Sequence, residues 1–139
     1  MIIIDGTNQI LGRVAVYSAK KALLGEQIAI INCEKIILSG TRTFILSKFE
    51  ERKERGHPYD GPFYPKSSDR IVRRTIRGML PYKQERGKQA YKKIMCYIGV
   101  PKQFQGKTYQ IVPGADASKL ETNNFMELQE ISAFLGKTH

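Results

Sequence analysis

Apolar residues follow two different periods along the chain, and together they predict alternating strands and helices. The predicted strands are short runs rich in β-branched and other apolar residues, at 2–4, 27–32 and 94–98, with a fourth strand or edge at 109–112. The predicted helices occupy residues 11–24, 41–55, 68–80 and 127–135, with a short helical piece after Gly87. This alternation favours an α/β fold with a small, mostly parallel sheet of about four strands.

The length and composition fit one domain of this kind. The chain has 139 residues, of which 41% are hydrophobic, so it is able to bury a modest core. We therefore predict a single domain of residues 1–139 with basic extensions. No run approaches the roughly 18 apolar residues that a membrane span needs, and the start, Met-Ile-Ile-Ile-Asp, has no basic region. We expect neither a membrane span nor a signal peptide.

The predicted basic helix, which either Ser67 or Ser68 caps, has a divided surface. At about 100° per residue its arginines share one arc of about 100°, and they are Arg70, Arg73, Arg74 and Arg77. The apolar residues opposite are Val72, Ile76, Met79 and Leu80. We expect the apolar side to pack on the core and all four guanidiniums to point away from it. Clustered arginines repel one another, so this face is favourable where it meets a polyanion.

The excess positive charge is concentrated in one internal block. Residues 42–93 hold 15 Lys and Arg against 6 Asp and Glu, whereas the rest of the chain holds 8 against 7. This distribution predicts a localised surface that binds a polyanion, and nucleic acid is the leading partner. An anionic membrane is a weaker alternative, because the block lacks an apolar face large enough for insertion. A merely solvated charged face is the remaining interpretation.

Two parts of this block allow two interpretations each. Residues 56–66 combine three prolines and two glycines with His57, Tyr59, Phe63 and Tyr64, which predicts a flexible loop. Its aromatic rings either stack on unpaired bases or fold back on the protein. Gly78 either marks the end of the basic helix or allows nucleic acid to approach the backbone closely.

The residues of enzymatic and metal sites do not occur at usable spacing. The stretch from Asp5-Gly6 to Gly12-Arg13 has only two glycines and no Gly-Lys-Ser/Thr, so we interpret it as a tight turn in which Asp5 makes local hydrogen bonds. Cys33 and Cys96 are expected to be buried free thiols, with a disulfide as the alternative. His57 and His139 do not give zinc-ligand spacing with either cysteine, so we expect no metal and no cofactor.

A series of short motifs makes the chain similar to a known family. The central ones are Ile-Arg-Gly-Met-Leu-Pro at 76–81, then Gly87, then Tyr-Ile-Gly at 97–99. The earlier ones are Ile4-Asp5-Gly6, Leu11-Gly12-Arg13, Ala19-Lys20, Ile30-Ile31-Asn32-Cys33-Glu34 and Ser39-Gly40. In this order and approximate spacing they resemble the universal large-subunit ribosomal protein thirteen family over residues 2–101. The short region between Gly40 and Ser68, and Gly-Val-Pro at 99–101, are similar to its archaeal and eukaryotic branch. The bacterial His-Pro-His pattern is missing after Pro101.

The resemblance implies a three-layer α/β/α architecture and a structural role on the cytoplasmic ribosome. It implies that the chain binds and organises large-subunit rRNA beside neighbouring ribosomal proteins and contributes to subunit assembly, with no catalysis and no small-molecule substrate. Charge and resemblance together predict RNA contacts from Arg42, Lys48, Arg52, Lys53, Arg55, His57, Tyr59, Tyr64, Lys66, Arg70, Arg73, Arg74, Arg77, Gly78, Lys83, Arg86, Lys88, Lys92 and Lys93. Two other classes compete: a nucleotide-dependent enzyme, which lacks a phosphate loop, and a DNA-binding regulator, which Pro81 and the following strand disfavour.

Overall fold

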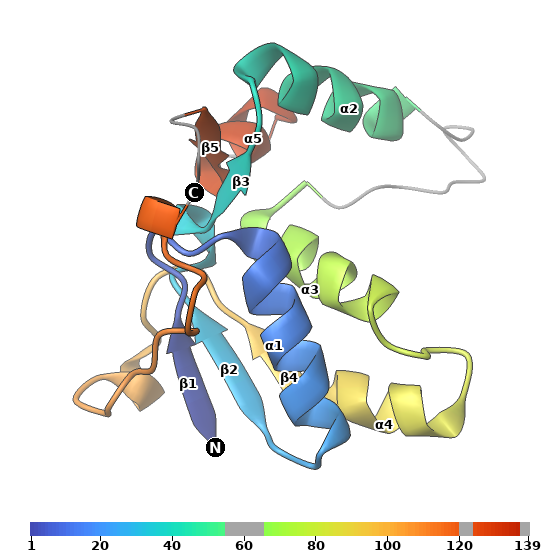
Figure 1. Ribbon diagram of the computed structural model, residues 1–139, viewed down its shortest axis with the longest axis vertical. Coiled ribbons are helices and arrows are strands. Elements are labelled where there is room, and N and C mark those ends of the chain that lie inside the picture. Colours follow the sequence, from blue (N-terminus) through green and yellow to red (C-terminus); the bar gives the residue numbers. More distant parts are fainter. Residues whose placement is uncertain (55–65, 120–123, 137–139) are drawn as a thin grey trace.

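The computed structural model describes residues 1–54, 66–119 and 124–136 of the chain (Figure 1). Its strands are β1 (Ile2–Asp5), β2 (Ile28–Ile31), β3 (Ile37–Ser39), β4 (Ile94–Cys96) and β5 (Phe125–Glu127). Its α-helices are α1 (Leu11–Leu23), α2 (Arg42–Glu54), α3 (Ser68–Gly78), α4 (Glu85–Lys92) and α5 (Leu128–Phe134). Three short 3-10 helices are η1 (Cys33–Lys35), η2 (Lys102–Phe104) and η3 (Ala117–Lys119).

The main sheet is parallel and has β2 at its centre. Its order is β1-β2-β4, and the register places Ile4 beside Ile30 and Ile30 beside Cys96. All four residues of β2 are buried, as its uninterrupted apolar sequence predicts. The expected edge at 109–112 is reduced to one parallel bridge, in which the Gln110 N–H donates to the Ile3 carbonyl at 2.7 Å.

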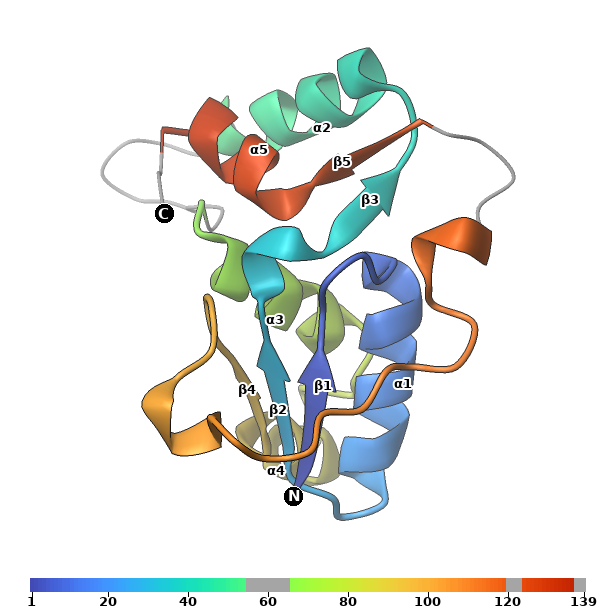
Figure 2. The same cartoon turned by 90° about the vertical axis from the view of Figure 1, so that its left-hand side faces the viewer.

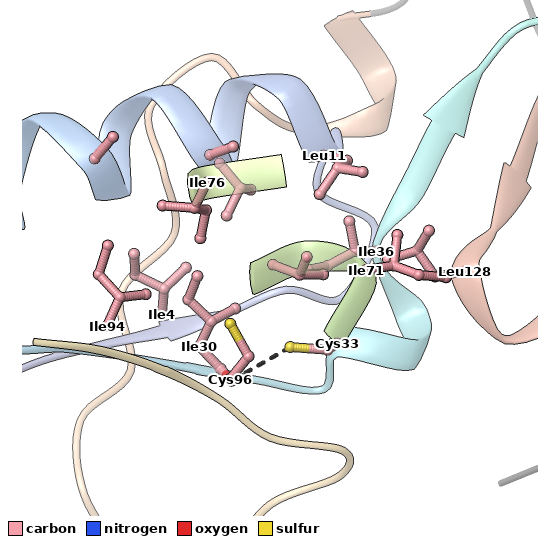
Figure 3. Close-up of a cluster of buried hydrophobic side chains, with 14 of the residues drawn as sticks. Ile4, Leu11, Ile30, Cys33, Ile36, Ile71, Ile76, Ile94, Cys96 and Leu128 are labelled. Carbon is pink, nitrogen blue, oxygen red and sulfur yellow. Dashed lines mark hydrogen bonds between the residues drawn. The ribbon is translucent and has the colours of Figure 1, made fainter. Parts of the chain in front are cut away.

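Helices cover one face of this sheet, and an extended segment covers the other (Figure 2). On the first face, small residues of α1 and apolar residues of α3 and α4 form the larger core with the sheet. Figure 3 shows Ile76 of α3 facing Ile4 and Ile94 of the sheet within this core. On the second face, Ile3, Ala29 and Ile31 pack against Phe104 of η2, with residues 97–109 forming the outer layer. The predicted α/β class with a small, mostly parallel sheet is confirmed. On the second face, η2 and an extended segment take the place of the second helical layer that an α/β/α arrangement would have.

A second, antiparallel sheet of β3 and β5 lies beyond the first one and was not predicted. It pairs Leu38 with Met126 and joins segments about 88 residues apart in the chain. Because Glu127 belongs to β5, the terminal helix begins at Leu128 rather than at Glu127. The prediction for α4 also needs correction: the helix begins at Glu85 and contains Gly87, instead of following it.

The apolar side of α3 differs from the predicted one by two residues. Ile71, Val72 and Ile76 are completely buried, and Ile71 was not part of the expected set. Met79 was expected in the core but is 41% exposed, because α3 ends at Gly78 and the chain turns there before Pro81. Leu80, after the helix end, returns to the core and is buried.

A close backbone contact joins the turn after α3 to α4. Gly87 is buried against Pro81: a Cβ added to Gly87 would overlap the Pro81 carbonyl group and lie 2.8 Å from the Tyr82 nitrogen. The Gln84 N–H donates to the Pro81 carbonyl at 2.9 Å and closes the turn. Only glycine therefore fits at position 87 while α4 keeps its place against the turn.

Asp5 organises the turn at the carboxyl ends of β1 and β2. Its carboxylate accepts hydrogen bonds from the Thr7 N–H at 3.0 Å, the Thr7 hydroxyl at 2.8 Å and the Asn32 amide at 3.1 Å. Burial alone would raise the pKa of Asp5, but these hydrogen bonds and the charge of Lys35 outweigh it and lower the pKa. The expected local role of Asp5 in a turn is confirmed.

Gly87→Ala is expected to destabilise the protein, because the added methyl group meets backbone rather than a side chain that could move. Overpacking of this kind costs about 1–3 kcal/mol or more. Gly78→Ala is the matched control, since a Cβ there meets nothing within 4 Å; its effect on stability should range from none to a gain of about 1 kcal/mol. Urea unfolding of the wild type and of both variants measures these changes in the free energy of unfolding. Equal stability of the two variants would contradict the close contact.

Asp5→Asn is expected to lose stability in a pH-dependent way. Since folding lowers the pKa of Asp5, the carboxylate stabilises the fold above its unfolded pKa of about 3.9. That contribution is lost as the pH falls through the folded-state pKa. Urea unfolding should show the wild type more stable than the variant near neutral pH, with the difference disappearing in acid. A difference that stays constant down to acidic pH would show that the Asp5 charge does not stabilise the turn.

Candidate nucleic-acid interface

The cations of residues 66–93 lie on α3, on α4, in the turn between them and directly beside the outer ends of the two helices, a region that we call the basic corner. This stretch contains ten Lys and Arg but only two acidic residues, Asp69 and Glu85. Both carboxylates already accept local hydrogen bonds: Asp69 from the Ser67 hydroxyl at 2.7 Å and Glu85 from the Gln89 amide at 2.9 Å. The local sequence therefore leaves a strong positive excess at this part of the molecule.

Most of the predicted cations in the basic corner are exposed to solvent. The exposed ones are Lys66, Arg70, Arg74, Lys83, Arg86, Lys88 and Lys92. They come from two helices, the turn between them and the residue before the N-cap of α3, so no single helical face in the sequence contains them all. The fold brings them to the helix-covered side of the sheet, where α1 supports both α3 and α4 (Figure 1). This arrangement suits an extended polyanion better than a single small anion.

The basic corner contains a hollow of about 550 Å³ between the end of α3 and α4. Its lining consists of Arg77, Tyr82, Lys83, Lys88, Tyr91 and Lys92. The sequence analysis did not single out these two tyrosines, because the aromatic residues that it considered were those of residues 56–66. A signal for Tyr91 was present, because it lies three residues after Lys88 and directly before Lys92, so helical geometry puts all three on one side of α4.

Arg73 does not point away from the protein, so that expectation is wrong. Its Nε donates to the Ile94 carbonyl at 3.1 Å, its Nη2 donates to the Tyr91 carbonyl at 3.3 Å, and its guanidinium lies 4.0 Å from the Tyr91 ring centre. Tyr91 is in the last turn of α4, where carbonyls lack helical partners and favour a nearby cation. Arg73 therefore ties α3 to the junction of α4 and β4.

Arg77 also makes an intramolecular contact, although a looser one. Its guanidinium lies 4.4 Å from the centre of the Tyr82 ring, a distance typical of a cation–π interaction. The side chain remains half-buried and lines the hollow. Gly78, the next residue, is exposed and has no neighbour within 4 Å of its Cβ position, so packing within the described chain does not require glycine there.

The remaining predicted contact residues lie away from the hollow or outside the described residues. Arg42 is 3.5 Å from Glu130 of α5, and both side chains are well exposed. Lys48 lines a separate hollow of about 210 Å³ beside α2. The Lys93 ammonium lies near Gly25, after the end of α1. Arg52 and Lys53 belong to α2, and Arg55, His57, Tyr59 and Tyr64, with most of loop 56–66, lie outside the described residues.

Other kinds of site find little support in the described residues. Cys33 and Cys96 are buried free thiols, as expected. Burial and the neighbouring Cys96 raise the pKa of the Cys33 thiol well above its usual value, so it stays protonated. In residues 1–54, 66–119 and 124–136 there is no group of three or more His, Cys, Asp or Glu able to hold a metal. None of the helices described there is long and apolar enough to span a bilayer.

Comparisons with known proteins agree with the motifs. Residues 1–103 match the family described as Ribosomal protein L13. The whole chain is 42% identical to the large ribosomal subunit protein uL13 of Picrophilus torridus and covers 99% of that protein. It is 43% identical to the protein of the same name from Methanosphaera stadtmanae, with 96% of each chain covered. The corresponding Methanosarcina barkeri protein is 42% identical, with 98% of each covered. The similarity to archaeal relatives extends through the tail, which has no diagnostic motif.

Arg73→Met is expected to destabilise the free protein by about 1.5–3 kcal/mol, because it removes hydrogen bonds from a charged donor to two carbonyls. Arg70→Met is the matched control. Arg70 lies on the same helix but is exposed, so its substitution should change stability by less than about 0.5 kcal/mol. Thermal or urea unfolding compares the two. If Arg73→Met is as stable as Arg70→Met, the Arg73 contacts do not hold α3 against α4.

Proposed function

This chain belongs to the ribosomal protein L13 family, and on that premise we propose that it is a structural constituent of the large ribosomal subunit that binds large-subunit rRNA through the basic corner. The observation that carries the proposal is the excess of ten cations over two engaged carboxylates in residues 66–93. Family membership supports the ribosomal role, and this surface supports the choice of RNA as the direct partner.

The proposed mechanism is electrostatic and not catalytic. RNA segments that converge in a folded particle repel one another through their phosphates, and exposed Lys and Arg side chains relieve that repulsion. The basic corner presents such side chains from α3, the turn and α4 in fixed relative positions. Binding would therefore hold neighbouring RNA segments at a defined separation, which is how the protein would contribute to subunit assembly.

The two competing classes fit the geometry less well. A nucleotide-dependent enzyme on a parallel sheet would place its site at the carboxyl ends of the strands. There, Asp5 is already held by Thr7 and Asn32, and the buried Glu34 accepts the Gly99 N–H at 2.8 Å. A DNA-binding regulator would need one helix free to enter a major groove. The contact between Gly87 and Pro81 instead keeps α4 against the turn that follows α3.

The further parts of the proposal follow from the family. The protein would function on the cytoplasmic ribosome beside other large-subunit proteins, and it would need neither a cofactor nor a small-molecule substrate. The exposed cations of the basic corner are the first group proposed to contact RNA. Arg42, Lys48, Arg52, Lys53, Arg55, His57, Tyr59 and Tyr64 form a second group, around α2 and loop 56–66, whose contacts stay predictions.

The double variant Arg70→Glu/Arg86→Glu is expected to bind large-subunit rRNA much more weakly than the wild type while keeping its fold. Both side chains are exposed, and neither lines the hollow. If the wild type neutralises about 6–10 phosphates, its affinity should fall by roughly 10³–10⁵ between 50 and 200 mM salt. The slope of the logarithm of affinity against the logarithm of salt concentration should be smaller in magnitude by about 2 for the double variant than for the wild type. Filter binding across a salt series, with circular dichroism to check folding, measures both effects.

The matched control is Lys102→Glu/Lys107→Glu, which changes the net charge equally but alters exposed cations at and beyond η2, by the other face of the sheet. It should lose far less affinity than the double variant of the basic corner. Equal losses from the two variants would mean that RNA responds to net charge rather than to this surface. A salt slope near zero for the wild type, or stronger binding to duplex DNA than to rRNA, would refute the proposed function.

A further inference from the structure

We propose that the hollow between the end of α3 and α4 takes one unstacked nucleotide of a bound RNA strand. Its base would stack against a tyrosine ring that lines the hollow, Tyr82 from the turn or Tyr91 from α4, and its flanking phosphates would meet the surrounding cations. This inference rests on the proposed function, since it names the form of RNA that the basic corner recognises. It goes beyond that function because general phosphate neutralisation requires no aromatic residues.

The lining of the hollow combines the two chemistries that a single-stranded nucleotide presents. Four of its six lining residues are cations, two are tyrosines, and none of the six is acidic. Its volume of about 550 Å³ lies within the range of roughly 300–1,000 Å³ that is typical of small-molecule sites. Proteins that bind single strands combine a positively charged groove with aromatic rings in this way.

Both rings are held in position before any partner arrives. The guanidinium of Arg77 lies 4.4 Å from the Tyr82 ring centre, and that of Arg73 lies 4.0 Å from the Tyr91 ring centre. Arg73 is itself fixed by its hydrogen bonds to the Tyr91 and Ile94 carbonyls. A ring that is already oriented loses less conformational freedom when a base stacks on it, so this arrangement favours binding.

The backbone contact at Gly87 gives the hollow its shape. Because Gly87 lies against Pro81, the turn that carries Tyr82 and Lys83 is brought close to the α4 residues that follow Gly87. Lys88, Tyr91 and Lys92 lie one to five residues further along α4 and form the opposite wall. The tyrosines therefore line one cavity although they are nine positions apart in the sequence.

The aromatic residues distinguish an unstacked nucleotide from other polyanions. A regular RNA duplex keeps its bases stacked inside, so it would offer this surface phosphates and sugars but no base face. An acidic peptide would satisfy the cations and leave the rings without a planar partner. A single strand or a bulged nucleotide offers both a phosphate and an exposed base, and base–aromatic stacking contributes about 1–3 kcal/mol per base.

Tyr82 is the residue to vary, since it is 37% exposed and its truncation should leave the core intact. The probes are an oligouridylate of about ten nucleotides with 2-aminopurine at its centre, and a blunt RNA duplex. Tyr82→Ala is expected to weaken binding of the single strand by about 5- to 150-fold, which corresponds to the loss of one stacked base. Binding of the duplex should be unchanged, and Tyr82→Phe should retain wild-type affinity for both probes.

Phe134→Ala is the matched control, because Phe134 on α5 is an aromatic residue of similar exposure, at 43%, that does not line the hollow. It should bind both probes as the wild type does. The 2-aminopurine emission should fall when the wild type or Tyr82→Phe binds, as expected for a base that stacks on a ring, and fall less with Tyr82→Ala.

Failure of this inference and failure of the proposed function give different results. If the wild type binds neither probe nor rRNA, the proposed function fails. Two results would refute only the nucleotide site while the wild type still binds RNA. In the first, Tyr82→Ala binds the single strand as tightly as the wild type does; in the second, it loses affinity for the single strand and for the duplex equally. Binding of free AMP as tight as that of the oligomer would overturn the assignment to an RNA strand, and preferential binding of polyglutamate would assign the hollow to an acidic peptide.

Discussion

The contact between the Gly87 backbone and the Pro81 carbonyl group is the constraint on which the functional surface depends. It leaves no space for a side chain at position 87, so α4 lies directly against the turn that ends α3. Without it, the end of α3 and the cations of α4 would not share one surface. With it, Arg77 at the end of α3, Lys83 of the turn, and Lys88 and Lys92 of α4 line one hollow that also contains two tyrosines. A local steric requirement of the backbone thus determines how positive charge is arranged on the surface.

The cations of the basic corner divide into two roles. Arg73 stabilises the fold, because it supplies hydrogen bonds to carbonyls that α4 and β4 leave available. Arg77 holds an aromatic ring and still lines the hollow. The exposed cations of α3, the turn and α4 lie where a phosphate can reach them from solvent. A cluster of arginines on one helix therefore does not act as a uniform surface, and variants chosen by charge alone would mix stability with binding.

The sequence predicted the elements whose signals are local and continuous. The buried strand β2 and the helices α1 and α2 follow directly from the pattern of apolar residues. At the start of α2 the Thr41 hydroxyl accepts the Phe44 N–H at 3.3 Å. The pairing of β3 with β5 could not be predicted, because three-residue strands carry almost no periodicity and their partners are distant in the chain. Arg73 was misjudged for a related reason: it sits at the border of the arginine arc, beside the buried residue Ile76, and its acceptors belong to a later part of the chain. Tyr82 and Tyr91 line one hollow only in the folded chain, whereas the aromatic residues that the sequence pointed to are grouped together in residues 56–66.

Lysine reactivity on the intact large subunit tests directly whether the basic corner is the RNA-binding surface. The subunits would come from the organism that encodes the chain. An amine-specific reagent would acetylate the lysines of the free protein and of the intact subunit, and mass spectrometry would compare the extent of acetylation at each lysine. Five lysines that are exposed in the free protein serve as reporters: Lys83, Lys88, Lys92, Lys102 and Lys107. We expect Lys83, Lys88 and Lys92 to become protected on the subunit, and this protection to be lost when the RNA is digested with nuclease. If these three remain as reactive on the subunit as in the free protein while Lys102 and Lys107 become protected, the basic corner is not the RNA-binding surface.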